Sequence, residues 1–328
     1  MRSPRFAPFA AAAVVAAGIV LASSRGDVDR MTIGDGLIYR YVAAHFSTPP
    51  EAIDPVVSSR GTSLRYGRVG LPALIWLGSA GRPQAMPYVQ PILMVLAAGG
   101  AGGATAKLLP RAGPIAALFP FLAPGFTLAV SGGFAEAPAV AFGLWAVVWA
   151  GERRWVPAAV MLVAAMLTRE NAGALLVGMA VWLLLRKTIR PIAILGLSVV
   201  PLIAWYGFVA SRYGEIPILD PYLRVTTETI AAPGVAIWRA LTDSTASGTL
   251  TAALHLALAL VAFALWRRSM TGAIAAAAGL QVLAAGRFSF VYEGEAFRQF
   301  AFLQLFLLMA LVWSRWGGAE QEARAEDG

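Results

Sequence analysis

The sequence predicts an all-helical integral membrane protein that crosses the bilayer about ten times. Of its 328 residues, 58% are hydrophobic and only 13% are charged, whereas soluble domains carry about 25% charged residues. The mean hydropathy is +0.67. Uncharged runs long enough to cross a hydrocarbon core of about 30 Å recur from one end of the chain to the other. These observations place the chain outside the range of soluble domains.

The candidate spans are uncharged runs that lie between charged connectors. Three of the runs, 137–151, 155–168 and 171–185, contain about 15 residues each, which is about 22 Å of helix. They therefore need flanking residues or a thinned bilayer to complete a crossing. The full set of runs is 6–24, 83–106, 112–135, 137–151, 155–168, 171–185, 191–211, 244–266, 269–286 and 299–314.

The distribution of basic residues predicts an orientation with both termini in the cytoplasm. With the N-terminus inside, every second connector is cytoplasmic, and Glu152 is the only acid in these connectors. A single helix through 155–185 would instead place Arg169 in mid-membrane, at a cost of about 2.5–3.5 kcal/mol. We therefore expect a hairpin that turns near Arg169. The basic residues of the cytoplasmic side are Arg2, Arg5, Lys107, Arg111, Arg153, Arg154, Arg186, Lys187, Arg190, Arg267 and Arg268.

The chain is predicted to form one transmembrane domain over residues 1–317. Its first outer loop is 24–82, its second long outer loop is 212–243, and residues 318–328 form a disordered cytoplasmic tail. The first run is interpreted as a retained span because it is longer than the core of a usual signal peptide, and a cleaved signal peptide is the alternative. A composition rich in Ala, Gly and Arg suggests the plasma (inner) membrane of a bacterium.

Composition and motifs argue against several functional classes. The chain has no cysteine and two distant histidines, His45 and His255, which excludes a thiol nucleophile and disfavours a zinc site. The net charge of +8 is dispersed among short connectors, so we expect no nucleic-acid partner. The Gly-rich run 99–103 lacks a following Gly-Lys-Ser/Thr and indicates helix packing. His255, in the middle of an apolar run, is expected to be a hydrogen-bonded core residue.

Polar residues gather on the predicted outer face, and they define a candidate site. Asp35 stands at the start of a predicted surface helix that carries Tyr39. Ionisable residues at the membrane edge are costly unless they are paired or used, so their clustering is a functional hypothesis by default. The candidate residues are Asp35, Tyr39, Arg65, Tyr66, Arg68, Glu136, Arg169, Glu170, Tyr292, Glu295 and Arg298.

Each candidate also has a purely structural interpretation. Asp35 and Glu136 are possible helix caps, a role that contributes about 1 kcal/mol. Arg169 and Glu170 are a possible interfacial ion pair, and the arginines of the first loop are possible anchors to lipid head groups. The coincidence of all these residues on one face favours a site over separate structural roles.

The order of these features resembles the GT-C superfamily of polytopic membrane glycosyltransferases, especially bacterial and GPI-mannosyltransferase-like members that use lipid-linked sugars. The resemblance covers most of the chain. Two features depart from the family pattern: the first loop carries one Asp where some members have an acidic pair, and no large soluble domain follows the spans. The matching segments are Gly34-Asp35-Gly36, Tyr66 to Leu77, Leu118-Phe119-Pro120, Gly133 to Ala137 and Leu167 to Gly173.

The resemblance implies transfer of a sugar from a polyprenyl-phosphate donor to an envelope glycan, lipid or protein acceptor on the non-cytoplasmic face. Asp35 would act as the general base for an inverting displacement, because phosphate leaves without a general acid. Arginines would hold the donor phosphate and stabilise its developing charge. The implied phosphate ligands are Arg65, Arg68, Arg169 and Arg298, and the implied substrate-pocket residues are Tyr39, Tyr66, Glu136, Glu170, Tyr292 and Glu295.

No cofactor is expected, because the arginines can neutralise the phosphate. A divalent metal bound by Asp35, Glu136 and Glu170 is the alternative. Two other functional classes stay open. A lipid or glycan flippase or transporter would favour ionisable groups near the bilayer midplane, and a non-catalytic membrane protein of envelope assembly would keep the fold without the chemistry.

Overall fold

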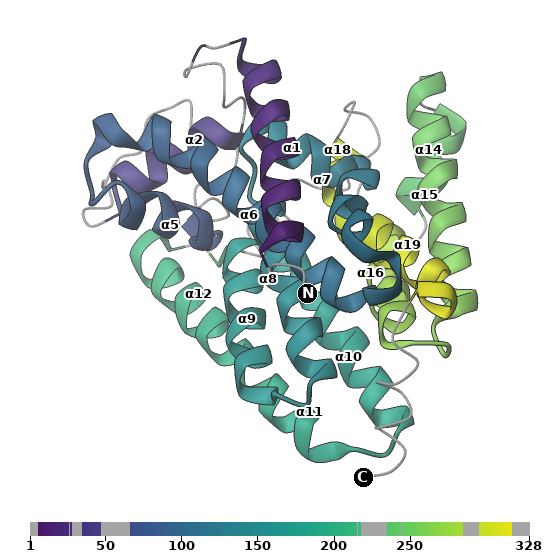
Figure 1. Ribbon diagram of the computed structural model, residues 1–328. Helices are drawn as coiled ribbons and strands as arrows, with labels where there is room; N and C mark the ends of the chain where they lie inside the picture. The colour runs from purple at the N-terminus through teal and green to yellow at the C-terminus, as the bar shows by residue number, and fades with distance from the viewer. Residues whose placement is uncertain are drawn as a thin grey trace.

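The computed structural model describes residues 6–25, 27, 35–46, 66–214, 216–217, 235–243, 245–284 and 295–316. Within these ranges every regular element is a helix and no strand occurs, which confirms the all-α class (Figure 1). The predicted tail at 318–328 and most of the second long loop lie outside the described residues.

The helices follow the predicted runs closely. Most runs begin or end within a few residues of a helix boundary, because charged or helix-breaking residues end both. Helices that match runs are α1 (Ala7–Ser24), η2 with α6 (Pro83–Ala85, Met86–Leu108), α8 (Glu136–Gly151), α9 (Trp155–Thr168), η4 with α10 (Glu170–Ala172, Gly173–Leu185), α15 (Ala246–Leu265), α16 (Met270–Ala284) and α19 (Ala301–Trp316). Short helices in the predicted outer segments are α2 (Asp35–Ala44), α5 (Gly70–Gly78), α14 (Val235–Asp243) and α18 (Glu295–Gln299).

The described residues contain 4 helices long and apolar enough to cross a membrane, or up to 5 if one bent pair counts as a span. The 4 helices are α1, η2 with α6, the segment 189–213, and α15. Five shorter apolar helices of 10–17 residues occupy the remaining predicted runs. The count of about ten crossings therefore stays a prediction.

The run 112–135 is not the single straight helix that its composition predicted. It forms η3 (Pro110–Leu122) and α7 (Pro124–Gly132), which are bent by 73° relative to each other. Proline removes a backbone donor and clashes with the preceding turn, and this segment contains Pro114, Pro120 and Pro124. The run 191–211 likewise divides into α11 (Ile189–Gly196) and α12 (Val199–Tyr213).

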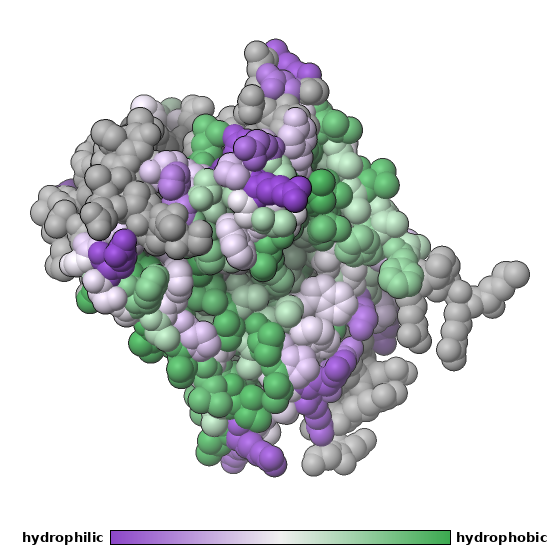
Figure 2. Space-filling view, turned by 90° about the vertical axis from the view of Figure 1, so that its left-hand side faces the viewer, coloured by the Kyte–Doolittle hydropathy of each residue, from purple (hydrophilic) through white to green (hydrophobic). Residues whose placement is uncertain are grey.

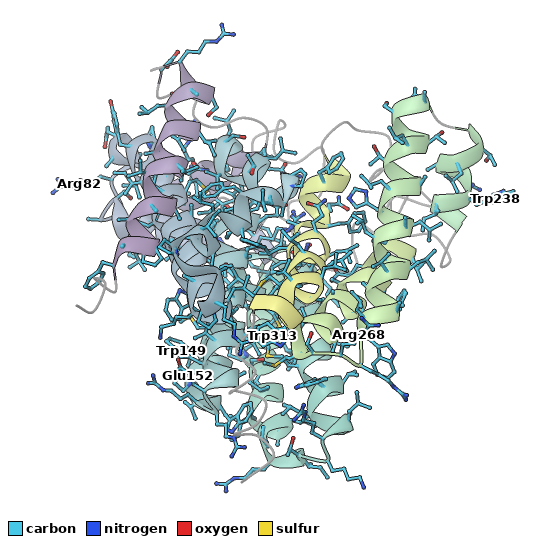
Figure 3. All side chains as sticks on the ribbon, turned by 45° about the vertical axis from the view of Figure 1, so that its right-hand side comes forward. Arg82, Trp149, Glu152, Trp238, Arg268 and Trp313 are labelled. Carbon is cyan, nitrogen blue, oxygen red and sulfur yellow. The ribbon has the colours of Figure 1, made fainter. Side chains whose placement is uncertain are left out.

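The predicted break between the fifth and sixth runs falls at Arg169. Its backbone is extended, with φ −152° and ψ 118°, so α9 and α10 are separate helices. Two of the connectors that were predicted to be cytoplasmic lie close to each other. Glu152 lies 3.5 Å from Lys107 and 3.9 Å from Arg154, which brings two basic connectors together. Figure 3 shows Arg82 and Trp238 toward one end of the helices, and Trp149, Glu152, Trp313 and Arg268 toward the other.

Small residues allow the helices to pack closely. A Cβ added at Gly99 would meet the ring of Phe9, and one at Gly102 would meet Ala12 and the carbonyl of Ala117. The Gly-rich run therefore serves helix packing, as predicted. Large apolar side chains remain exposed on the outside, as Val200 (57%) and Ile203 (64%) of α12 show, and Figure 2 shows apolar residues covering much of one face. Such exposure is expected of a surface that contacts lipid.

Candidate functional site

Six of the predicted site residues converge at one end of the helices. They come from segments that are distant in sequence: the start of α2, the residues before α5, the start of α8, the break after α9, and α18. The six residues form two groups joined by ion pairs, one made of Asp35, Glu136, Arg169 and Arg298 and the other of Arg68 and Glu170.

The first group is a chain of alternating charges. Arg298 Nη2 lies 3.0 Å from Asp35 Oδ2, and its Nε lies 3.4 Å from Glu136 Oε1. Arg169 Nη2 lies 3.0 Å from the same Glu136 oxygen. The guanidinium of Arg298 also lies over the ring of Phe134, 4.4 Å from its centroid. One carboxylate thus joins two arginines, and one of these reaches Asp35.

The side chains of the first ionic group differ in how deeply they are buried. The side chain of Glu136 is completely buried, and the side chains of Arg169 and Arg298 are 3% and 8% exposed. The side chain of Asp35 is 15% exposed. Of these four side chains, that of Asp35 is therefore the most accessible to a substrate.

The second group is a bidentate pair. Arg68 Nε donates to Glu170 Oε2 at 2.9 Å, and Nη2 donates to Oε1. Burial opposes ionisation of Glu170, but attraction to Arg68 and then to Arg169 outweighs it and lowers the pKa of Glu170 to about 2. Burial also opposes the charge on Arg68, and the attraction of Glu170 raises its pKa well above the usual value. Both groups therefore stay charged at neutral pH.

These pairings correct two of the structural interpretations. Arg169 and Glu170 do not pair with each other: Arg169 pairs with Glu136, and Glu170 pairs with Arg68. Glu136 is the first residue of α8, but its oxygens accept no hydrogen bond and the helix has no side-chain cap. Its carboxylate instead forms ion pairs with Arg169 and Arg298.

A buried glutamine that sequence reasoning missed holds two of these segments together. Gln90 of α6 donates from Nε2 to the carbonyl oxygens of Gly36, at 3.1 Å, and Gly133, at 2.7 Å. Gly36 follows Asp35, and Gly133 adopts a left-handed conformation with φ +71° just before α8. A glutamine inside a predicted apolar run was the available signal, since polar groups in a bilayer must be satisfied.

Polar residues also fix α18 through its main chain. Gln304 Nε2 donates to Phe297 O at 3.2 Å, and Asn171 Nδ2 donates to Gln299 O at 2.9 Å. Gln304 Nε2 also lies 3.0 Å from His255 Nε2. His255 is fully buried and hydrogen-bonded, which confirms that it is a satisfied core residue.

Three buried donor atoms of two predicted site residues, Arg169 and Tyr39, have no hydrogen-bond partner. Arg169 is 3% exposed, yet its Nε and Nη1 make no hydrogen bond. The hydroxyl of Tyr39, a completely buried residue of α2, also has none. Buried donors are rarely left unsatisfied in folded proteins, so such atoms indicate room for a ligand or water. Both donor types suit an anion.

The remaining predicted residues lie elsewhere or outside the described part of the chain. Tyr66 packs against Tyr213, with ring centroids 5.0 Å apart, and belongs to a small apolar cluster with Val42 and Val209. Arg65, Tyr292 and the side chain of Glu295 lie outside the described residues. Within the described residues, no group of three or more His, Asp or Glu side chains could hold a metal ion. The alternative metal site stays a prediction.

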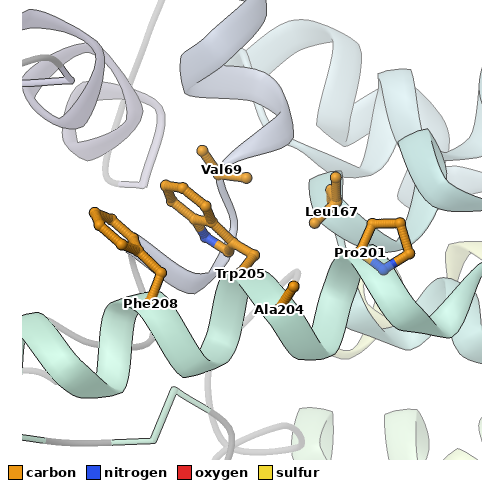
Figure 4. Close-up of a pocket in the computed structure, with 6 residues that line it drawn as sticks. All are labelled: Val69, Leu167, Pro201, Ala204, Trp205 and Phe208. Carbon is orange, nitrogen blue, oxygen red and sulfur yellow. The ribbon is translucent and has the colours of Figure 1, made fainter.

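An apolar groove is lined by six residues from α9, α12 and the segment before α5 (Figure 4). It has a volume of about 380 Å³. Val69 directly follows Arg68, and Leu167 precedes Arg169 by two residues, so the groove adjoins both arginines in sequence. The residues that line it are Val69, Leu167, Pro201, Ala204, Trp205 and Phe208. Such a groove can accept an apolar chain.

Comparisons of this chain with protein-family models, with curated proteins and with solved structures found no match.

Proposed function

We propose that this protein is a membrane glycosyltransferase of the GT-C type. It moves a hexosyl or pentosyl group from a polyprenyl-phosphate donor to an envelope glycan, lipid or protein on the non-cytoplasmic face of a bacterial plasma membrane. The observation that carries the proposal is the ionic group in which Asp35 pairs with Arg298, and Glu136 joins Arg298 to Arg169, whose Nε and Nη1 have no hydrogen-bond partner.

The charge balance suggests how the donor enters. Among the described residues of the site, three arginines face three carboxylates, so their charges balance before an anion arrives. A donor phosphate that binds the unused N–H groups of Arg169 would also attract Arg298. Arg298 would then exchange its contact with Asp35 for one with phosphate, and Asp35 would become available to the acceptor hydroxyl.

The reaction then needs one base. The acceptor oxygen attacks the anomeric carbon while the bond from that carbon to the phosphate oxygen breaks on the opposite side. Asp35 takes the hydroxyl proton, and the phosphate leaves with the bonding electron pair, held by arginine. The product is the glycosylated acceptor with inverted anomeric configuration, and polyprenyl phosphate is released.

The groove supports a lipid-linked donor over a soluble one. Its lining is apolar, and one of the lining residues, Val69, directly follows Arg68 in sequence. An isoprenoid chain in the groove would place its phosphate near the ionic groups. A soluble nucleotide sugar would gain nothing from such a surface.

A non-catalytic role in envelope assembly is the second candidate. It is favoured by the pairing of each described arginine of the site with a carboxylate, because ion pairs of this kind also fix helices relative to one another.

The test is sugar transfer by the purified protein from a panel of radiolabelled polyprenyl-phosphate sugars, measured beside donor binding. We expect Asp35→Asn to lower transfer by about 10²–10⁴-fold while donor binding survives. Asp27→Asn, an exposed acid of the same loop, is the matched control and should transfer normally. Donor binding without transfer by the wild type would favour the non-catalytic or flippase reading. Normal transfer by Asp35→Asn would refute the assignment of the base.

A further inference from the structure

Two glutamines bind main-chain carbonyls next to the two members of the Asp35–Arg298 pair. Gln90 binds the carbonyl that follows Asp35, and Gln304 binds the carbonyl that precedes Arg298. We propose that Gln90 and Gln304 are positioning residues that set the distance between the base and its arginine. The catalytic importance of this distance rests on the proposed function. The positioning itself can be measured without any reaction.

Gln90 fixes the acidic side. Its side chain is fully buried, and its single amide nitrogen is shared by carbonyls that lie 54 and 43 residues away in sequence. One of these carbonyls belongs to Gly36, beside Asp35, and the other belongs to Gly133, just before Glu136. The amide thus ties together the two backbone segments that carry the carboxylates of Arg298. A residue without donors would remove this hydrogen bond from both buried carbonyls.

The orientation of the Gln304 amide follows from its partners. Its Oε1 accepts the main-chain N–H of Gly125 at 3.0 Å, so its nitrogen must face Phe297 O and His255 Nε2. An amide nitrogen only donates, and His255 Nε2 therefore accepts. The proton of the neutral ring then lies on Nδ1, which is 2.8 Å from Thr251 O. Every polar atom of this buried cluster has a defined role.

Gln304 fixes the basic side. Helix α18 has 5 residues, too few to hold its own position. Its main chain is instead held on both sides of Arg298, by Gln304 at Phe297 O and by Asn171 at Gln299 O. A Cβ added at Gly125 would collide with Phe297 O, so α18 also lies directly against the backbone of α7. The guanidinium of Arg298 is therefore placed by groups that Asp35 never contacts.

This placement matters for the proposed chemistry because a general base must lie within hydrogen-bond reach of the proton it removes. A displacement of about 1 Å at a reacting group can cost about 10²-fold in rate. Loss of Gln304 should therefore lower kcat by about that factor and leave the KM for the donor nearly unchanged, since the groove and Arg169 are intact.

The decisive experiment needs no substrate. The thermal midpoint of the full-length protein in detergent is measured with and without Asp35→Asn, first in the wild type and then in the Gln304→Leu and Gln90→Leu backgrounds. Thr105→Val is the matched control background, because Thr105 is a buried side chain that donates to a main-chain carbonyl, Ala101 O at 2.8 Å, in the part of α6 remote from Gln90. If a leucine variant does not fold, Gln304→Asn and Gln90→Asn shorten the same amides by one methylene.

We expect Asp35→Asn to lower the midpoint by the same amount in the wild type and in Thr105→Val. When either glutamine is replaced, the decrease caused by Asp35→Asn should be at most half as large. A glutamine with a merely structural role would lower all midpoints but leave the effect of Asp35→Asn unchanged, and that result would overturn the proposal. So would the absence of any effect of Asp35→Asn in the wild type. If the midpoints behave as expected but no sugar is transferred, the positioning stands and the proposed function fails.

Discussion

The buried carboxylate of Glu136 offers a direct test of the ionic site. Replacing it by Gln keeps the size of the side chain and removes its charge. Two nearly buried arginines then lose the anion that lies 3.0 Å from Arg169 and 3.4 Å from Arg298. The structure predicts a large loss of stability, because a buried charge deprived of its partner is not compensated by water.

The magnitude follows from these distances. At an effective dielectric constant of about 20, each contact corresponds to a gross attraction of about 5 kcal/mol. Desolvation offsets much of this gain, and breaking a buried pair by removing one partner costs about 3–5 kcal/mol net. At about 2–4 °C per kcal/mol, the thermal midpoint should fall by roughly 6–20 °C.

The assay is thermal unfolding in detergent followed by tryptophan fluorescence, since the chain contains 10 Trp residues. Glu152→Gln is the matched control. Glu152 also faces two cations, at 3.5 and 3.9 Å, but its side chain is 34% exposed, and exposed pairs contribute about 0–1 kcal/mol. A double variant, Glu136→Gln with Arg169→Met, should be less destabilised than the sum of the two single variants.

Two results would refute this reasoning. If Glu136→Gln lowers the midpoint no more than Glu152→Gln does, burial does not make the first pair stronger. If the double variant is strictly additive, Glu136 and Arg169 do not interact in the way that their distance implies.

Three further predictions concern pH, packing and topology. Because attraction to arginine lowers the pKa of Glu170 from 4.5 to about 2, its contribution to stability is complete above about pH 4.5 and is lost as the pH falls toward 2; Glu170→Gln should flatten the pH dependence of the thermal midpoint in that window. Gly125→Ala should destabilise the protein by about 1–3 kcal/mol in chemical or thermal unfolding by pushing α18 away, whereas Gly207→Ala, which has open space around it, should be neutral or slightly stabilising. Since the chain has no cysteine, single cysteines at the exposed positions Arg82 and Arg154 should react with an impermeant thiol reagent from opposite sides of the membrane, and reaction from the same side would refute the orientation.

The sequence predicts most of the helices because charge determines where an apolar run must end. The run 155–168 matches α9 residue for residue, and Asp35 begins α2 as expected. The bend between η3 and α7 was missed, because an uncharged run with several prolines is compatible with either a straight or a broken helix. Composition does not distinguish these cases.

The convergence of the site could be predicted, but its pairing could not. Alternating connectors place Asp35, Glu136, Arg169 and Arg298 on the same side of the helices whatever their packing. The pairing of arginines with carboxylates depends on how each helix is rotated about its axis. Arg169 and Glu170 are neighbours in sequence, but they form ion pairs with different residues. Gln90 was missed for a related reason: its role is set by two carbonyls that are remote in sequence.

The great separation in sequence between Asp35 and Arg298 has a consequence for biosynthesis. The two residues are 263 positions apart, and a chain emerges from the ribosome with its N-terminal part first. The Arg68–Glu170 pair, 102 positions apart, can close when about half of the protein has been made, but the Asp35–Arg298 pair must wait for almost the whole of it. A chain that ends before residue 298 would therefore lack the arginine that pairs with Asp35. The two ionic groups of the site thus become complete at different stages of synthesis.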